Sequence, residues 1–360
     1  MIERLVIGSL LDETFKKKID SISNTCLRSR KEKDKCTRCF DICPEKALSL
    51  TDQGVYVDPL KCTGCNLCVT ACYSRTLKSP DRPYLAFINK ALDENLTSFS
   101  CTCMENKSKA DVNFGCLRTI DPRFLAGIFA ADLKAQVFMD FSHCDQCQYK
   151  DLGWDTKALI EDFREKAQGE NLKISFESFK DKLDEDLSRR DLFKNIFKTT
   201  EDLAKSSVRS TSKSLGLDLE REEDLDTLIK ILLKKAVKDG KDLGLYLPFV
   251  YSLDIEKPCV FCRTCQTFCP SGALKVESNK EADILSFDPD LCNFCGRCLE
   301  KCPSNIFTKA LLKDFEKKHL YKKEKALCKG CKTNTSDLNE EGYCLACALR
   351  RKNRRGNNRR

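Results

Sequence analysis

The 360-residue sequence is poor in histidine, methionine and tryptophan, with 2, 3 and 1 of them respectively. With His143 and His319 as its only imidazoles, the chain cannot build a poly-histidine metal centre and has little material for histidine-based acid–base catalysis. It also lacks a nucleophile–base pair, a phosphate-binding glycine loop and a dinucleotide fingerprint. No uncharged apolar stretch approaches the ~20 residues that a membrane-spanning helix needs. Neither catalysis by the usual side chains nor a membrane span is therefore expected.

Cysteine, by contrast, occupies 25 of the 360 positions. A disulfide framework would need an oxidising compartment. The short apolar run at residues 5–11 lies between Glu3 and Asp12 and lacks the small-residue cleavage site of a secretory signal. An odd number of cysteines would also leave one thiol unpaired. We therefore expect a cytoplasmic protein whose clustered thiols bind metal.

Eight cysteines in the second half of the chain form two C-x2-C-x2-C-x3-C runs, each followed by proline. Such runs hold [4Fe–4S] clusters, and the fourth cysteine of each run binds the other cluster. The two-residue steps let a tight loop place successive sulfurs around the cluster while backbone N–H groups point at its negative charge. Zinc is the alternative, but zinc sites do not use eight cysteines at this spacing. The expected ligand sets are Cys259, Cys262, Cys265 and Cys302, and Cys292, Cys295, Cys298 and Cys269.

The N-terminal part of the chain repeats this pattern with two departures. Tyr73 replaces the proline after one run, and Lys33 stands where the other run should begin with cysteine. We infer that Cys26 supplies the missing ligand, because the longer loop adds little closure entropy. The alternative is a three-cysteine [3Fe–4S] centre in which Cys26 is only a core thiol. The expected ligand sets are Cys26, Cys36, Cys39 and Cys72, and Cys62, Cys65, Cys68 and Cys43.

These motifs resemble the bacterial-type dicluster [4Fe–4S] ferredoxins, and they occur twice, at about residues 22–80 and 250–308. A chain with several such domains is a polyferredoxin. The resemblance implies a pseudo-twofold fold in which short β-hairpins and helices surround two clusters. It also implies low-potential one-electron transfer.

Between the two ferredoxin-like regions, helix-like and strand-like segments alternate. This alternation predicts a small parallel sheet with right-handed crossovers. Five cysteines follow the predicted strands, and ligands of open α/β sheets collect at the carboxyl ends of strands. We therefore expect a further metal centre there. The predicted helices are residues 84–95, 121–133 and 154–167, and the predicted strands are residues 96–100, 111–114, 135–141 and 172–176.

Residues 115–147 resemble the iron–sulfur subunit that links methyl-viologen-reducing hydrogenase to heterodisulfide reductase, on the basis of Cys116, Asp121, Pro122, Cys144 and Cys147. The Cys101-x-Cys103 pair departs from the spacing in that family. The resemblance implies a [2Fe–2S] or [4Fe–4S] cluster, and zinc ligation or buried apolar thiols are the alternatives. His143 is interpreted as a polar loop residue. The expected ligands are Cys101, Cys116, Cys144 and Cys147, with Cys103 as a spare or substitute.

Residues 184–240 contain no cysteine and are rich in charge, which suggests a helical linker. Apolar residues at helical spacing predict one helix there, with Asp218 able to cap its start and Gly240 its end. Packing of this helix on its own chain is the default expectation. Its apolar face consists of Leu225, Leu228, Ile229, Leu232 and Ala236.

The last four cysteines follow the pattern C-x2-C-x12-C-x2-C, which fits a structural zinc ribbon with no open position for catalysis. A rubredoxin-like single iron is the alternative. Residues 350–360 carry seven Lys and Arg residues and no acid, which is typical of a disordered solubilising tail or a docking arm. The expected zinc ligands are Cys328, Cys331, Cys344 and Cys347.

The sequence therefore predicts an α+β multidomain protein. We expect dicluster ferredoxin domains at 1–80 and 246–310, a small α/β parallel-sheet domain at 81–180 between them, a helical linker at 181–245, a zinc-ribbon-like module at 320–350 and a basic tail at 351–360. The expected function is electron transfer through four [4Fe–4S] clusters, as a non-catalytic partner or subunit of an oxidoreductase. One alternative makes the central site catalytic towards a sulfur compound. Another is a redox sensor that binds nucleic acid through the ribbon and tail, and we favour it least.

Overall fold

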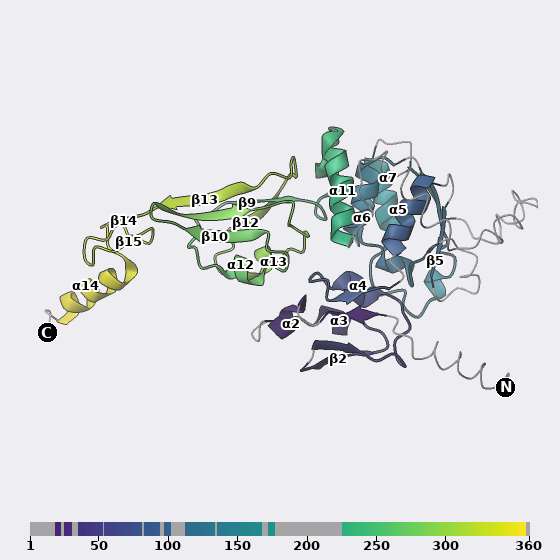
Figure 1. The fold of residues 1–360 in the computed structure, drawn as a ribbon, viewed down its shortest axis with the longest axis horizontal. Coiled ribbons are helices and arrows are strands. Elements are labelled where there is room, and N and C mark those ends of the chain that lie inside the picture. The colour runs from purple at the N-terminus through teal and green to yellow at the C-terminus, as the bar shows by residue number, and fades with distance from the viewer. Residues whose placement is uncertain are drawn as a thin grey trace, which may run out of the picture. The chain divides into compact units, whose positions relative to one another are not determined.

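The computed structural model describes residues 19–22, 25–30, 35–52, 54–80, 83–93, 97–101, 112–133, 135–167, 172–176 and 225–357. The chain divides into two compact units, Met1–Val250 and Tyr251–Arg360 (Figure 1). Cys103 and residues 181–224 of the expected linker, which include Asp218, lie outside the described residues. Within the described ranges, no helix is long and apolar enough to cross a membrane.

Very short elements carry the cysteine loops at the start of the first unit. Strand β2 pairs with β3, and β1 pairs with β4, both antiparallel. Ile19, Val55, Cys68 and Leu77 form the buried core between them. The elements are β1 (Asp20–Ser21), α2 (Leu27–Arg30), α3 (Arg38–Asp41), β2 (Leu48–Thr51), β3 (Gly54–Val57), α4 (Leu67–Ala71) and β4 (Leu77–Lys78).

A four-stranded parallel sheet in the order β6-β5-β7-β8 forms the middle of the first unit. The register pairs Ser100 of β5 with Asn113 of β6, and Phe99 of β5 with Met139 of β7. The carboxyl ends of these three strands therefore reach the same edge of the sheet. The elements are α5 (Pro83–Asp93), β5 (Thr97–Ser100), β6 (Val112–Asn113), η3 (Leu117–Thr119), α6 (Pro122–Ala130), β7 (Ala135–Met139), η4 (Cys144–Gln146), α7 (Thr156–Lys166) and β8 (Leu172–Ser175).

Helix α6 is buried along its whole length. It starts at a strong cap, because the side chain of Asp121 accepts a hydrogen bond of 2.9 Å from the backbone N–H of Arg123. Pro122 occupies the first turn, where its missing N–H costs nothing. The sequence Asp-Pro thus fixes where this helix begins.

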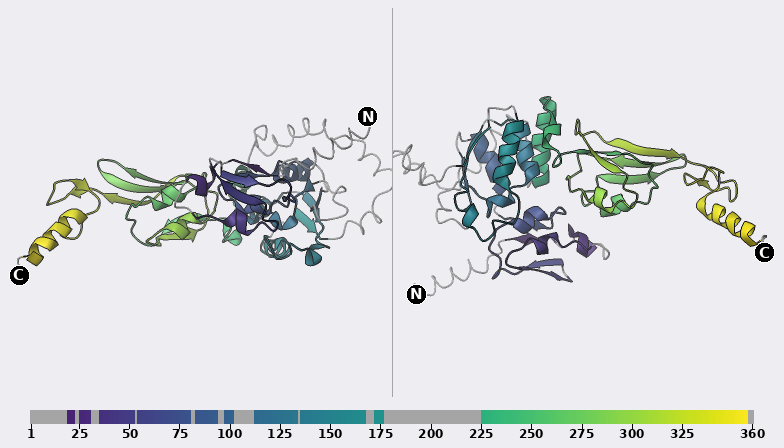
Figure 2. Two further views of the ribbon diagram at one scale, coloured as in Figure 1. Left: turned by 90° about the horizontal axis from the view of Figure 1, so that it is seen from below. Right: turned by 180° about the vertical axis from the view of Figure 1, so that it is seen from behind.

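Helix α11 (Leu225–Lys238) packs against α6 and stands beside it in Figures 1 and 2. The residues that it buries include Leu228, Leu232 and Ala236. The approach is close because α6 presents Gly127, where an added Cβ would lie 3.1 Å from the Cβ of Leu232. Residues 225–238 therefore form a helix that packs on its own chain within the first unit, which was the default expectation.

Gly240 ends α11 in the left-handed conformation, with φ of 71°. Its N–H donates to the carbonyl of Val237 at 3.1 Å, and the next N–H donates to Ala236 at 3.0 Å. This is the glycine-type helix end that the sequence predicts. A short 3₁₀ turn, η5 (Leu243–Tyr246), follows and buries Leu243 and Tyr246.

The first part of the second unit contains two antiparallel sheets and two short helices that carry cysteines. Strand β9 pairs with β12, and β10, β11 and β13 form a three-stranded sheet. Because β13 pairs with β11, this sheet continues past residue 310, where the ferredoxin-like domain was expected to end. The elements are β9 (Ser252–Ile255), α12 (Thr264–Phe268), β10 (Leu274–Ser278), β11 (Ala282–Phe287), α13 (Arg297–Lys301), β12 (Phe307–Ala310) and β13 (Lys318–Glu324).

The last part of the second unit is a two-stranded ribbon followed by a helix. Strands β14 (Ala326–Leu327) and β15 (Asn334–Thr335) pair antiparallel. Helix α14 extends over Leu345–Asn357, so most of the basic segment that was interpreted as a disordered tail is helical.

Candidate metal centres

The same backbone turn leads into three of the cysteine-bearing helices. Helices α4, α12 and α13 each begin directly after a residue in the left-handed region: Asn66 with φ of 64°, Arg263 with φ of 62° and Gly296 with φ of 72°. Such a residue lets the loop reverse sharply before the helix. The third cysteine of each run consequently lies in the first turn of its helix, close to the two cysteines of the loop.

In the second unit, the thiols group as two interleaved sets. Burial raises the pKa of Cys265 to about 12, and the like charges that add to this effect come from Cys259, Cys262 and Cys302. Burial also raises the pKa of Cys292 well above its ordinary value, and its charged neighbours are Cys295, Cys298 and Cys269. In both sets the fourth cysteine of one run lies with the first three of the other. Buried thiolates so close together require a positive partner, which an iron–sulfur core supplies.

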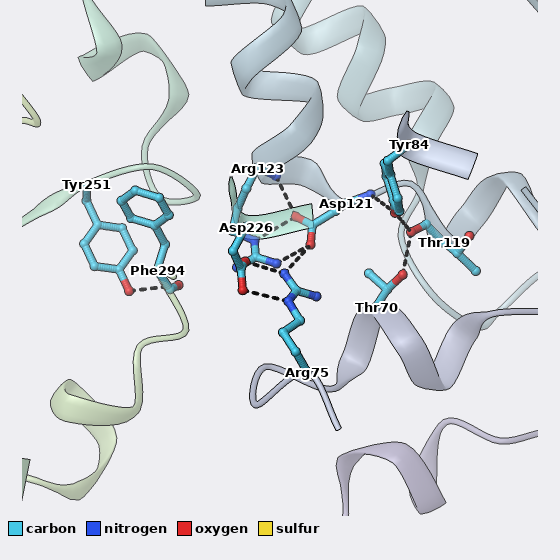
Figure 3. Close-up of polar contacts among 9 residues, drawn as sticks. All are labelled: Thr70, Arg75, Tyr84, Thr119, Asp121, Arg123, Asp226, Tyr251 and Phe294. Atoms are coloured by element: carbon cyan, nitrogen blue, oxygen red, sulfur yellow. Dashed lines mark hydrogen bonds and ion pairs between the residues drawn. The ribbon is translucent and has the colours of Figure 1, made fainter. Parts of the chain in front are cut away.

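A pocket and several backbone hydrogen-bond donors lie next to these thiols. A small pocket is lined by all four cysteines of the first set. The backbone N–H of Phe261 donates to the sulfur of Cys259, and that of Phe294 donates to the sulfur of Cys292, each at 3.3 Å. The Phe294 loop is held in turn by Tyr251, whose hydroxyl donates to the Phe294 carbonyl at 3.1 Å (Figure 3). Inward N–H groups of this kind stabilise an anionic cluster.

The first unit groups its thiols in the same interleaved way. Burial raises the pKa of Cys68 well above its ordinary value, with further contributions from the charges of its neighbours. A small cavity lies beside this set. The cysteines that line this cavity are Cys43, Cys62, Cys65 and Cys68.

Cys26 lies with the other set of the first unit. Burial raises the pKa of Cys39 to about 12, and its charged neighbours are Cys72, Cys36 and Cys26. The residue before Cys26 is anchored near Cys72, because the hydroxyl of Thr25 bonds to that of Thr76 at 3.1 Å. Helix α2 starts directly after Cys26. The structure thus places four thiols at this site, which is the arrangement that a four-cysteine cluster needs.

Tyr73, which replaces the usual proline, lies between two guanidinium groups. Arg38, from the Cys36–Cys39 loop, lies 4.4 Å from the centre of its ring, and Arg123 of α6 lies 5.8 Å from it. The aromatic ring thereby connects the end of one cysteine run to the central region through cation–π contacts. A proline at this position would make neither contact.

The central cysteines lie at the carboxyl edge of the parallel sheet. Cys101 directly follows β5, Cys116 lies between β6 and η3, and the η4 turn after β7 contains Cys144 and ends at Cys147. Cys101 and Cys116 are buried, whereas Cys144 and Cys147 are partly exposed. The topology therefore brings Cys101 and Cys116 to one edge, and Cys144 and Cys147 follow a third strand whose carboxyl end lies at the same edge. The four cysteines come from segments up to 46 positions apart.

The C-terminal cysteines are packed more tightly than any other such group in the described ranges. The sulfurs of Cys328, Cys331, Cys344 and Cys347 all lie within 4.8 Å of one another, and no other described set of three or more His, Cys, Asp or Glu ligand atoms is as compact. The sulfurs of Cys331 and Cys344 are 3.8 Å apart. Four sulfurs at ~2.3 Å from one tetrahedral zinc ion would be separated by about 3.8 Å. The spacing fits a single ion, and the wider interleaved sets do not.

Backbone N–H groups also prepare this C-terminal site for a cation. The N–H of Cys344 donates to the sulfur of Cys328 at 3.3 Å. Hydrogen bonds from the backbone of Cys331 and Cys344 lower the pKa of Cys328 to about 6. A thiolate is the form that binds zinc.

Several contacts join the loops of the N-terminal cysteines to the central cysteines. The side-chain amide of Asn66 donates to the carbonyl of Phe114 at 3.0 Å, and the hydroxyl of Thr70 donates to the carbonyl of Thr119 at 2.7 Å. Tyr149 donates through its hydroxyl to the carboxylate of Glu45 at 2.5 Å. The sequence analysis did not predict these contacts, because the spacing of the cysteines does not indicate which loops are in contact in the folded protein.

A buried ion-pair network lies beside them (Figure 3). Arg75, three residues after Cys72, forms two hydrogen bonds with Asp226 of α11, at 2.5 and 2.8 Å. Arg123 contacts the same carboxylate at 3.3 Å and also pairs with Asp121. The hydroxyl of Tyr84 donates to the Thr119 carbonyl at 2.8 Å and accepts from the N–H of Asp121. The network fastens the N-terminal cysteine loops, α6 and α11 together.

Comparison with known proteins agrees with this arrangement. The 4Fe-4S dicluster domain family matches residues 34–76 and 258–306, which confirms the expected resemblance to dicluster ferredoxins in both units. Pyruvate synthase subunit PorD of Methanocaldococcus jannaschii is 41% identical over 83 residues, which are 23% of this chain and 92% of that protein. Ferredoxin-type protein NapF of Haemophilus influenzae is 35% identical over 78 residues, and polyferredoxin protein MvhB of Methanothermobacter marburgensis is 45% identical over 49 residues. The chain spans 43% of NapF and 12% of MvhB.

Proposed function

Because this chain belongs to the ferredoxin-type proteins that carry the 4Fe-4S dicluster domain, we propose that it is a polyferredoxin that relays single electrons through four [4Fe–4S] clusters. The single observation that carries the proposal is the interleaving of thiols in both units, where the fourth cysteine of each run lies with the first three of the other. That arrangement holds two clusters within one small domain. Each cluster would accept and release one electron.

The proposed ligands follow the observed groups. In the first unit, Cys26, Cys36, Cys39 and Cys72 would hold one cluster, and Cys43, Cys62, Cys65 and Cys68 the other. In the second unit, the sets are Cys259, Cys262, Cys265 and Cys302, and Cys269, Cys292, Cys295 and Cys298. The proximity of Cys26 to Cys39 favours a four-iron cluster over a three-iron centre at the first of these sites.

Two further centres complete the proposal. Cys101, Cys116, Cys144 and Cys147 would hold an additional [2Fe–2S] or [4Fe–4S] cluster, which is supported by their position at one edge of the parallel sheet. Cys328, Cys331, Cys344 and Cys347 would hold a structural zinc ion, which is supported by the 3.8 Å sulfur–sulfur separation. The zinc would stabilise the ribbon and would take no part in electron transfer, because four thiolates fill its coordination shell.

The proposed partner is an oxidoreductase. One relative is named as a subunit of pyruvate synthase and another as a subunit of NADH-quinone oxidoreductase, and both are redox complexes. A relay supplies single electrons, and the partner performs the chemistry on the substrate. We propose the cytoplasm as the compartment, since clustered thiols bind metal in reducing surroundings.

Anaerobic purification with metal analysis tests the proposal. We expect about 16 irons per chain from four [4Fe–4S] clusters, additional iron from the central site and about one zinc. Mössbauer and EPR spectra should show cubane clusters that dithionite reduces. Cys344→Ser should remove the zinc and leave the iron content unchanged. A sample that contains only zinc and does not react with dithionite would disprove the relay.

A further inference from the structure

The loop of Cys116 lies directly against one of the two N-terminal cluster sites. Gly115, which precedes Cys116, packs against Gly64 and Cys65. A Cβ added at Gly115 would lie 2.5 Å from the Gly64 carbonyl oxygen and 3.1 Å from the carbonyl carbon of Cys65. Gly115 also has φ of 78°, which only glycine adopts readily. The backbone that carries one expected ligand therefore touches the backbone that carries another.

Asn66 strengthens this contact. It follows Cys65, and its amide donates to the carbonyl of Phe114, two residues before Cys116. The cluster loop does not itself need an asparagine here, because the equivalent left-handed positions of the second unit are Arg263 and Gly296. Asn66 is buried, with 8% of its surface exposed. Its side chain thus serves the contact with the central region.

A second contact comes from the other side of the central site. Tyr149, two residues after Cys147, donates to the carboxylate of Glu45, two residues after Cys43. Cys43 and Cys65 belong to the same thiol group. Two of the three segments that carry the central cysteines, the Cys116 loop and the Cys144–Cys147 loop, therefore reach the cluster site of Cys43, Cys62, Cys65 and Cys68.

The other N-terminal site faces the central region differently. Tyr73, which follows Cys72, contacts Arg123 of α6, and Arg75 pairs with Asp226 of α11. None of these partners lies next to a central cysteine. Thr70, two residues before Cys72, donates to the carbonyl of Thr119, three residues after Cys116, at 2.7 Å. These contacts run through side chains, whereas Gly115 meets the Cys65 loop backbone to backbone.

We propose that the contact of Gly115 and Asn66 with the Cys65 loop is the electron-transfer junction between the N-terminal cluster pair and the central centre. The Cys43–Cys62–Cys65–Cys68 cluster is then the member of the pair that exchanges electrons with the centre. In each event one electron leaves the reduced cubane and enters the oxidised central centre, and no atom or proton changes place. This inference rests on the proposed function, since it requires a redox-active metal centre at the central cysteines.

Two substitutions test the junction in the full-length, anaerobically purified protein. Asn66→Gly installs the residue that the equivalent α13 loop already uses, so the cluster loop keeps its conformation and loses only the bond to Phe114. Gly115→Ala forces the two loops apart, because its new methyl group meets a backbone oxygen. Gly240→Ala is the matched control, since Gly240 also has positive φ but an added Cβ meets nothing within 4 Å.

The measurement is rapid freeze-quench EPR after mixing with sub-stoichiometric dithionite, together with the iron content of each variant. We expect unchanged iron and unchanged cubane signals in all three variants. The signal of the central centre should appear more slowly in Asn66→Gly and Gly115→Ala than in the wild type and in Gly240→Ala. Slowing without loss of iron identifies a junction rather than a folding defect.

The outcomes separate the two proposals. If the wild type shows a reducible central centre that fills at the same rate in all variants, the junction is disproved and the proposed function stands. If the wild type shows four cubanes and no reducible central centre, the central part of the proposed function fails, and the junction with it. If Gly115→Ala loses iron through misfolding, Asn66→Gly decides the question by itself.

Discussion

Asp226 is the residue at which three parts of the first unit meet. From the first turn of α11 it pairs with Arg75, behind the Cys72 loop, and with Arg123, near the start of α6. Burial alone would raise the pKa of this carboxyl, but the two arginines hold it below its ordinary value of 3.8. The network is therefore fully charged at neutral pH, and each member depends on the others for charge compensation.

Replacing Asp226 with asparagine should destabilise the first unit by about 3–5 kcal/mol, because it leaves two buried arginine charges, Arg75 and Arg123, with Asp121 as their shared carboxylate. The loss should be the same at pH 6 and pH 8. A carboxylate with a lowered folded pKa contributes its full stability above its unfolded pKa, and that contribution disappears only as the pH falls towards the folded value. Urea unfolding of the anaerobic holoprotein measures the effect.

Asp239→Asn provides the control, since Asp239 forms an exposed i,i+4 ion pair with Lys235 on the same helix. Exposed pairs contribute little to stability, so its unfolding midpoint should match the wild type. Equal midpoints for the two variants would mean that the buried network does not hold α11 in place.

The structural role of some of these residues can be predicted from the sequence, and that of others cannot. The Asp121-Pro122 pair predicts the start of a helix because capping is local. The partner of Arg75 lies 151 positions away, and no local pattern connects the two. Gly115 and Asn66 were missed for the same reason, although the glycine beside Cys116 is visible in the sequence.

The packing of α11 on α6 depends on one matched pair, Leu232 and Gly127. Leu232 is 3% exposed and belongs to the apolar face that the helical spacing predicted. The periodicity therefore identified the helix and its buried side. The periodicity could not identify α6 as the neighbour of α11. Gly127 lies within an apolar helix, and no feature of the sequence around it indicates that Leu232 packs there.

Leu232→Ala should cost about 2–5 kcal/mol by opening a cavity over Gly127. Adding Gly127→Ala should return part of that loss, because the new methyl group enters the space that Leu232 leaves. The four corners of this cycle, measured by chemical unfolding, should show favourable coupling between the two alanines, as expected for residues in contact. Strict additivity would show that the two side chains do not share one space.

Elements with strong local signals lie close to their predicted positions. Helix α7 (Thr156–Lys166) falls within predicted residues 154–167, and β8 (Leu172–Ser175) within 172–176. Strand β13 was not predicted, because Lys318–Glu324 is mostly polar and partly or fully exposed. Its strand conformation depends on pairing with β11, which is a tertiary effect.

At the scale of the whole chain, each compact unit contains its own pair of interleaved thiol sets. The cysteine spacing was sufficient to predict these sets, because an iron–sulfur loop is a local structure with strict geometry. The spacing could not predict which sets lie near the central cysteines. That information comes from the way η3 and the Cys116 loop pack on α4 and the Cys65 loop.

Cluster assembly should therefore be independent in the two units. Cys298→Ser should reduce iron in the second unit and leave the EPR signals of the first unit unchanged, and Cys68→Ser should have the reciprocal effect. Iron analysis and EPR of the two purified variants measure this. Loss of every cluster from either variant would show that the units load as one.

Within a unit the opposite holds, because each run lends its last thiol to the other run's site. Loss of one cluster is therefore expected to weaken the other cluster of the same unit. When oxygen destroys one cluster, the other still takes its fourth ligand from a loop that no longer has a cluster of its own to hold it in place. We therefore expect the two clusters of a unit to be gained and lost together. In a cell short of iron, we expect chains with a filled pair or an empty pair to outnumber those with a single core.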